Sequence, residues 1–205
     1  MQFNSLREKI IDYPVFGFSD ILKWFPKENP QILKLQINQW QKKGYLQRIK
    51  RGLYFFSEAK IKDHFFVANR IYTPSYISLE TALNCYSIIP DIPQMLTCVT
   101  PLTTAKFKTP FGVFFYHHLK SDYFFGFETV KSQGEKYSYA IALPEKALLD
   151  FIYFNLPRFS KMESFEEERF EFEKDFRWPL FIKMAKVFKN KKILGVAKKI
   201  KEIYD

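Results

Sequence analysis

The stretch that decides the fold of the N-terminal region is QILKLQINQWQKKGYLQRIKRGLYFF, residues 31–56. It contains no Asp or Glu, although 22 of the chain's 205 residues are acidic. Its cations are Lys34, Lys42, Lys43, Arg48, Lys50 and Arg51. Because a carboxylate on such a surface would repel phosphate, this charge pattern favours an anionic partner.

The first half of this stretch carries the start and stop signals of a helix. Asn29 is a favoured N-cap, Pro30 suits the first helical position, and Gly44 fits a left-handed C-cap. Apolar side chains recur at helical spacing on the inward side: Leu33, Ile37 and Trp40. The outward side carries polar side chains: Gln31, Lys34, Asn38 and Gln41. The pattern therefore predicts an amphipathic helix over residues 30–43.

The second half predicts a β-hairpin. YLQRI and LYFF are short strand-forming runs, and the basic turn KRG joins them. Upstream, residues 5–12 predict a short helix that Pro14 ends. DILKWF, residues 20–25, predicts another, which Ser19 and Asp20 cap and Pro26 stops. Three helices followed by a hairpin are the layout of a winged helix-turn-helix, expected over residues 1–58.

A winged helix suits DNA for a direct physical reason. Its third helix fits the major groove, and its hairpin can reach flanking phosphates or the minor groove. The expected DNA-binding residues are Gln31, Lys34, Asn38, Gln41 and Lys42 on the helix, with Arg48, Lys50 and Arg51 on the hairpin. A solvated charged face and a protein-binding winged helix are the alternatives. We favour DNA because the acid-free helix and the basic hairpin occur together.

Composition sets the wider class. The formal net charge of +10 lies at the two ends of the chain, since residues 59–183 carry equal numbers of acids and cations. The two cysteines, Cys85 and Cys98, are too few for a disulfide scaffold. The N-terminus lacks the apolar core of a signal peptide, and no apolar run is long enough to span a membrane. We expect a cytoplasmic protein without membrane partners.

Residues 59–205 predict an α+β domain with an antiparallel sheet. Strands are expected at MLTCVTP, TAKFK, GVFFYHHL, YFFGFETV and YSYAIAL. Helices are expected at SLETALNCYSII, with Ser78 as its N-cap, and at PEKALLDFIYFNL. Within this domain, residues 162–205 form a helical extension whose role the sequence does not assign. An acidic helix over residues 163–175 is expected there, either as a solvated face or as a contact for a basic protein; we favour the solvated face.

The sequence offers little catalytic chemistry. His117 and His118 are adjacent in a predicted strand, so their side chains point to opposite faces and cannot share a metal. Cys85 and Cys98 lack metal-ligand spacing and read as core thiols. Glu80, Glu145 and Asp150 are candidates for paired carboxylates, but Glu80 and Glu145 each lie in the first turn of a predicted helix, where an acid complements the dipole. We expect no metal, no cofactor and no enzymatic activity.

The order of several motifs resembles a known family. RIKRGLYFF is followed by YISLETALNCYSIIP, TCVTPLTTAKFKTPFGVFFYHHL, FFGF and YAIALPEKALLDFIYF. This order resembles the AbiEi family, the antitoxins of type IV toxin–antitoxin (abortive infection) systems, which are also described as transcriptional regulators. The resemblance covers roughly residues 5–156, and the last helical block lies outside it.

The resemblance implies an autoregulator. The winged helix would bind inverted repeats in double-stranded DNA upstream of its own operon, and the larger domain would carry the antitoxin activity. The functional partner would be a nucleotidyltransferase-like toxin of the AbiEii type, without a stable complex as a rule. A solitary winged-helix regulator, and a protein-interaction module that binds its partner directly, stay open as alternatives.

Overall fold

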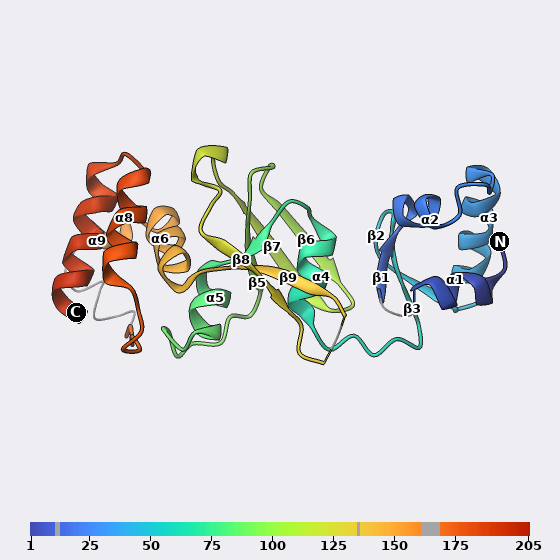
Figure 1. Ribbon diagram of the computed structural model, residues 1–205, viewed down its shortest axis with the longest axis horizontal. Coiled ribbons are helices and arrows are strands. Elements are labelled where there is room, and N and C mark those ends of the chain that lie inside the picture. Colours follow the sequence, from blue (N-terminus) through green and yellow to red (C-terminus); the bar gives the residue numbers. More distant parts are fainter. Residues whose placement is uncertain (11–12, 135, 161–168) are drawn as a thin grey trace.

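The computed structural model describes residues 1–10, 13–134, 136–160 and 169–205. The protein is elongated (Figure 1). N-terminal helices with a small sheet lie at one end, a larger sheet lies in the middle, and C-terminal helices lie at the other end. The α+β class and the helical C-terminus are confirmed.

The N-terminal unit, residues 1–58, combines helices with a small antiparallel sheet. Its elements in chain order are α1 (Phe3–Ile10), β1 (Val15–Gly17), α2 (Phe18–Trp24), α3 (Pro30–Lys42), β2 (Leu46–Lys50) and β3 (Leu53–Phe56). The strand order is β1-β3-β2. The helices and the β2–β3 hairpin were predicted, whereas β1 was not, because three residues between Pro14 and Phe18 give no strand pattern.

Local signals explain the bounds of α3. The Asn29 side chain accepts a hydrogen bond of 2.8 Å from the backbone N–H of Gln31, and Pro30 begins the helix. At the other end, Gly44 follows the C-cap with a φ of +76°, a conformation that glycine adopts without strain. The apolar stripe is buried against the other helices, so the polar stripe of α3 is fixed outward.

The small sheet is buried on both faces. Phe16, Leu46 and Phe56 pack against the helices of the N-terminal unit. On the other face, Val15, Ile49, Leu53 and Phe55 join the core of the larger sheet. Successive side chains of a strand point to opposite faces, so the single strand β3, with the sequence LYFF, supplies both cores. Apolar packing therefore holds the N-terminal unit against the rest of the molecule.

The larger sheet is mixed rather than fully antiparallel. Its strands are β4 (Tyr76–Ile77), β5 (Leu96–Thr100), β6 (Ala105–Thr109), β7 (Gly112–His118), β8 (Phe127–Lys131) and β9 (Ser138–Ala142), in the order β6-β7-β5-β4-β9-β8. The pairs β6–β7 and β8–β9 are antiparallel, as predicted, and so is β4–β5, although strand β4 itself was not predicted. The pairs β5–β7 and β4–β9 are parallel. The chain reverses twice between β5 and β7, so β7 inserts beside β5 in the same direction.

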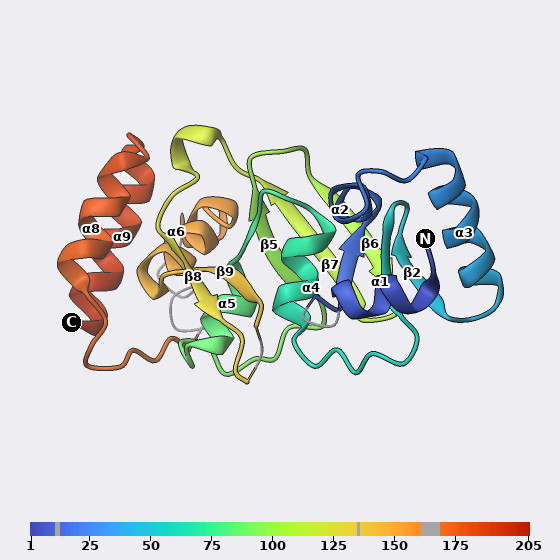
Figure 2. The same cartoon turned by 45° about the vertical axis from the view of Figure 1, so that its right-hand side comes forward.

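Helices cover this sheet. They are α4 (His64–Ile71), α5 (Leu79–Cys85) and α6 (Pro144–Phe154). Helix α4 contacts β4 and β9, while α5 packs on β5 and on α6 (Figure 2). Helix α4 was not predicted, although Asp63 gives its signal: the Asp63 carboxylate accepts hydrogen bonds from the backbone N–H groups of Phe65 and Phe66.

The C-terminal region corrects one prediction. Helices α8 (Trp178–Val187) and α9 (Lys191–Tyr204) pack on each other and on α6. The acidic helix expected over 163–175 is wrong for residues 169–175, which are not helical; residues 163–168 lie outside the described part. In RFEFE the apolar residues Phe170 and Phe172 recur every second position, a period that matches extended chain rather than helix. Short 3-10 turns occur at Ser121–Tyr123 and Arg158–Ser160.

Candidate nucleic-acid interface

The outward face of α3 carries the side chains that the sequence assigned to DNA. Gln31, Lys34 and Asn38 are exposed, as is Lys42 at the end of the helix. Gln41 is half-buried, and its amide donates a long hydrogen bond of 3.4 Å to Oδ1 of Asn38. The structure therefore brings the predicted helix residues together on one accessible surface.

A shallow hollow joins α3 to strand β2. It is lined by Leu35, Asn38, Gln39, Gln41, Lys42, Leu46, Gln47 and Arg48. None of these lining residues is acidic. The hollow places amide side chains, which can bond base edges, between the cations Lys42 and Arg48.

Two of the three hairpin cations are accessible. Arg48 and Arg51 are exposed on the β2–β3 hairpin. Within the part of the chain that the structure describes, no carboxylate forms an ion pair with Lys34, Arg48 or Arg51. Their charge is available to an external anion.

Lys50 has a different environment. Its ammonium lies 5.0 Å from the ring centroid of Phe107 and 5.8 Å from that of Tyr72, both in the neighbouring domain. Partial burial lowers the pKa of Lys50 below its ordinary value. Cation–π contacts of this kind hold β2 against β6. Sequence reasoning missed this role, because both rings lie far from Lys50 along the chain.

A second hollow lies on the other side of Arg48. It is lined by Arg48, Ile49, Lys50, Arg51, Lys108, Thr109 and Pro110. Lys108 belongs to the β6–β7 hairpin and was not among the predicted site residues. The signal that could have found it is the alternation in AKFKT, which places Lys106 and Lys108 on one face of a strand.

Two of the three candidate catalytic carboxylates, Glu145 and Asp150, have structural partners. Glu145 is buried at the start of α6, and its two oxygens accept hydrogen bonds of 2.7 and 3.1 Å from the guanidinium of Arg177. The backbone N–H of Arg177 donates to the same carboxylate at 3.2 Å. This pair anchors the start of α8 to α6, and it raises the pKa of Arg177 above its ordinary value.

Asp150 lies at the centre of a fully buried polar cluster. It accepts hydrogen bonds from the hydroxyls of Tyr76 at 2.9 Å and Ser78 at 2.8 Å, and it forms an ion pair with Lys146 one turn away. The Lys146 ammonium also donates to the Tyr76 hydroxyl at 2.9 Å. Burial lowers the pKa of Lys146, and the charge of Asp150 opposes that effect. Ser78 precedes α5 as predicted but does not cap it through its side chain.

The histidines and cysteines do not come together. His117 packs beside Phe154 of α6, whereas Nδ1 of His118 lies 2.7 Å from the carbonyl oxygen of Leu102, as expected for side chains on opposite faces. Cys98 is buried, as predicted, whereas Cys85 is exposed, so the prediction of a core thiol is wrong for Cys85. Among the described residues, no group of three or more His, Cys, Asp or Glu side chains is arranged to hold a metal.

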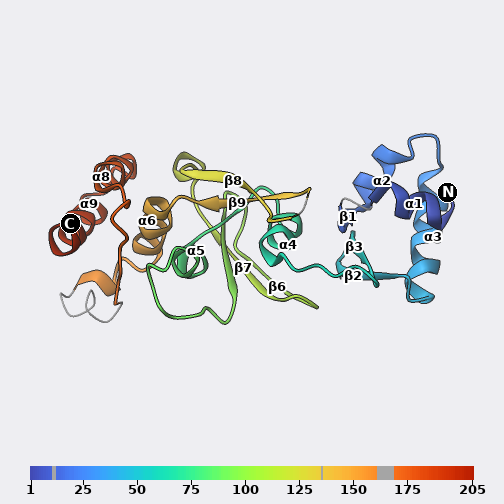
Figure 3. The ribbon, with the colours of Figure 1, turned by 60° about the horizontal axis from the view of Figure 1, so that its bottom comes forward.

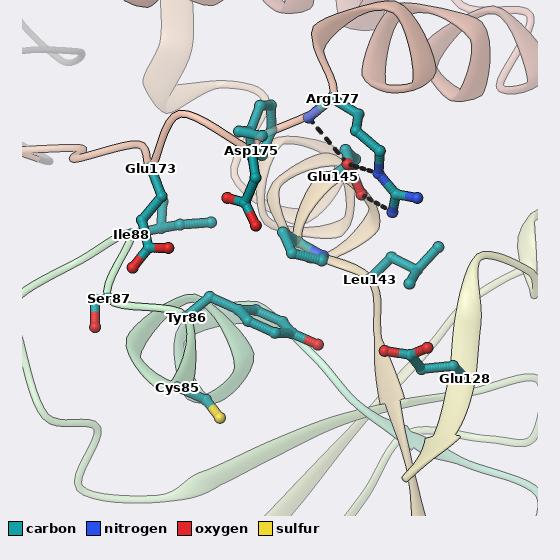
Figure 4. A pocket seen from close by; sticks show the side chains of 12 residues that line it. Cys85, Tyr86, Ser87, Ile88, Glu128, Leu143, Glu145, Glu173, Asp175 and Arg177 are labelled. Atoms are coloured by element: carbon teal, nitrogen blue, oxygen red, sulfur yellow. Dashed lines mark hydrogen bonds and ion pairs between the residues drawn. The ribbon is translucent and has the colours of Figure 1, made fainter.

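A pocket of about 640 Å³ has the opposite charge to the α3 surface. It lies between α5, the start of α6 and the segment that leads into α8 (Figure 4). The carboxylates of Glu128, Glu173 and Asp175 surround it, together with the Glu145–Arg177 pair. Two of its acids, Glu173 and Asp175, belong to the stretch for which the sequence predicted an acidic helix, and they line this pocket instead.

Comparisons with known proteins add no assignment. No family model matches the chain, and a search among curated proteins finds no significant match. None of the helices in the described ranges is long and apolar enough to cross a membrane.

Proposed function

We propose that residues 1–58 form a winged helix that binds double-stranded DNA. The observation that carries this proposal is the acid-free surface that runs from α3 to the β2–β3 hairpin. Gln31, Lys34 and Asn38 on the polar face of α3 are exposed, and Arg48 of the hairpin lies beside this helix. A helix of this length fits the major groove, and DNA is the polyanion whose shape matches a protruding helix flanked by a basic hairpin.

The side chains divide into two roles. Gln31, Asn38 and Gln41 carry amides that can bond adenine or other base edges. Lys34, Lys42, Arg48 and Arg51 would neutralise phosphates, which gives affinity without sequence preference. Lys50 contributes mainly by holding the hairpin in place, because its ammonium is packed on two rings.

For the whole chain we propose a transcriptional autoregulator and antitoxin resembling the AbiEi family. DNA binding is supported by the surface of the N-terminal unit, whereas the antitoxin role rests on the order of the sequence motifs. In this proposal the protein is not an enzyme, and its functional partner is a nucleotidyltransferase-like toxin. A reading frame for such a toxin beside the gene is the expected genetic context.

One observation favours a second candidate, a protein-interaction module. The outward side of α3 exposes Ile32 and Leu35, whose exposed fractions are 49% and 62%. Exposed aliphatic side chains on a helix suit a protein contact. Leu35 also fits the DNA proposal, since an apolar side chain can contact the methyl group of thymine. A solitary regulator, without a toxin, is the remaining alternative.

The first experiment is fluorescence anisotropy on the DNA upstream of the protein's own gene. A scrambled duplex of equal length is the control, and both are titrated at two salt concentrations. We expect tighter binding to the native duplex that persists at moderate salt. If both duplexes bind equally and lose affinity as the salt concentration rises, the interaction is only general charge attraction. That result would favour the protein-interaction module.

A second experiment separates autoregulator from antitoxin. The protein is co-expressed with the neighbouring nucleotidyltransferase-like protein, and growth and co-purification are measured. Restored growth without a stable complex is the result expected for the antitoxin proposal. Co-purification would favour direct neutralisation, and unrestored growth would leave a solitary regulator.

A further inference from the structure

The two acid-free hollows form one continuous basic surface across two domains. Arg48 lines both of them, with α3 on one side and the β6–β7 turn on the other. Figure 3 shows the β6–β7 hairpin extending from the larger sheet toward β2. Within the residues that line the two hollows there are five cations and no carboxylate: Lys42, Arg48, Lys50, Arg51 and Lys108. The positive surface therefore continues beyond the N-terminal unit.

The β6 strand presents two lysines at this boundary. Lys106 and Lys108 are both exposed and stand on the same face of the strand, with Phe107 on the other. Strand β6 is an edge of the larger sheet, so one side of it is not covered by another strand. In the described structure neither lysine has a carboxylate as an ion-pair partner.

The turn that follows these lysines is held in one conformation. The Thr109 hydroxyl donates a hydrogen bond of 3.1 Å to the carbonyl oxygen of Gly112, and it accepts one of 3.0 Å from the backbone N–H of Phe111. Gly112 has a φ of +110°, which favours glycine. The backbone of this turn is therefore already ordered, and little backbone conformational entropy remains to be lost when the hairpin binds a partner.

Contacts between the domains fix the hairpin relative to α3. The rings of Phe55 and Phe111 meet with centroids 4.9 Å apart, and Lys50 lies over Phe107. On the other side of the interface, Arg70 of α4 pairs with Asp20 of α2. The two basic elements thus lie side by side across a packed interface, and a single long polyanion can meet both.

We propose that the β6–β7 hairpin is a second DNA-backbone contact, with Lys106 and Lys108 bound to phosphates beside those held by the β2–β3 hairpin. The occupant is duplex DNA, and the inference rests on the function proposed above. The argument for it is charge complementarity: phosphates are spaced regularly along a duplex, and a protein surface that continues past the groove-binding helix meets more of them. Lysines here add affinity without sequence preference.

The test uses the full chain with Lys106→Gln and Lys108→Gln together. Binding to the native and scrambled duplexes is measured by anisotropy over a range of salt concentrations. We expect affinity for both duplexes to fall by between about 5-fold and 30-fold at about 0.15 M salt, with the slope of log K against log salt reduced by about 1 to 2. The preference for the native duplex should not change.

A charge-matched control is Lys198→Gln with Lys199→Gln. Both residues are exposed on α9, at the opposite end of the molecule from α3 (Figure 1). The control should keep the wild-type slope.

Equal slopes for wild type and the β6 variant would overturn the inference. An equal loss of affinity in the control would also overturn it, because net charge alone would then explain the effect. Failure of the proposed function is a separate result, because the wild-type protein would then not prefer its own DNA. Binding of an acidic protein to the hairpin, with DNA affinity unchanged, would also reject the DNA contact.

Discussion

Cations occupy two very different environments in this protein. On the surface of α3 and the β2–β3 hairpin, Arg48 and Arg51 are exposed and no described carboxylate pairs with them. In the core, Lys146 is fully buried and paired with Asp150. Glu145 is likewise buried, and Arg177 bonds it.

The difference indicates where each charge finds its counter-charge. A buried charge costs several kcal/mol to desolvate unless a partner lies beside it, so the core pairs must be complete within the fold. An exposed charge costs little and needs no internal partner. A surface that collects such charges and excludes the opposite sign is suited to a partner that supplies the missing sign. The following predictions test this division.

The largest expected effect comes from breaking the buried pair. Asp150→Ala would leave the Lys146 ammonium and the hydroxyls of Tyr76 and Ser78 without their acceptor. We expect the free energy of unfolding to fall by about 3–5 kcal/mol in denaturant titrations. The double variant Lys146→Met with Asp150→Leu should recover much of this loss. If Asp150→Ala were as stable as wild type, water would have to reach the cluster. The buried and exposed cations would then not differ in the way described.

The next effect should appear on the surface without a loss of stability. Arg48→Gln with Arg51→Gln removes two exposed cations. We expect DNA affinity at about 0.15 M salt to fall about 30-fold for every sequence, with a salt slope smaller by about 1.8, because two phosphates are no longer neutralised. The free energy of unfolding should stay within about 0.5 kcal/mol of the wild-type value. If the variant instead lost stability and kept the wild-type salt slope, these arginines would stabilise the fold rather than bind phosphates.

Asn38→Ala tests whether the side chains of the α3 surface divide into those that contact bases and those that contact phosphates. If the amide reads a base, the variant should lose about 1–3 kcal/mol of discrimination against the wrong base at one position, while binding to scrambled DNA stays the same. Competition between duplexes that differ at single positions measures this. A uniform loss for all duplexes would instead make Asn38 a residue that positions the helix.

The smallest effect concerns the half-buried imidazole of His117. Burial lowers the pKa of His117 below its ordinary value near 6.5. As the pH falls through this window the unfolded chain takes up the proton before the folded chain does, so stability is complete above about 6.5 and declines on acidification. His117→Phe should remove this pH dependence, which is measured by thermal unfolding at pH 5 and pH 8. A variant with the same pH dependence as wild type would assign the decline to other groups.

The sequence predicted what local chemistry decides. The Asn29 cap, Pro30 and Gly44 set the bounds of α3, and each acts within a few residues of itself. Asn38, Gln41 and Lys42 consequently lie beside Arg48 in one hollow, whereas the Lys50 ammonium packs on two rings. The hairpin was equally local, since a tight turn brings two short strands together.

The rest depends on contacts between distant segments. The Lys50 ammonium packs on the rings of Tyr72 and Phe107. The sequence pattern of strand β2 alone contains no information about these contacts. The strand expected at YFFGFETV begins only at Phe127, because Gly126 turns the chain with a φ of +74° against the side chain of Lys146. The parallel pairs of the larger sheet likewise follow from topology, which alternation along a strand does not encode.

The small N-terminal sheet has a consequence for modularity. Val15, Ile49, Leu53 and Phe55 belong to the core of the larger sheet although they stand in the N-terminal unit. A chain cut after residue 58 would turn this apolar face outward, and we expect such a fragment to self-associate. The unit is therefore not a module that can be moved to another protein unchanged. A graft that keeps its behaviour must carry the neighbouring sheet with it, or replace those four side chains with polar ones.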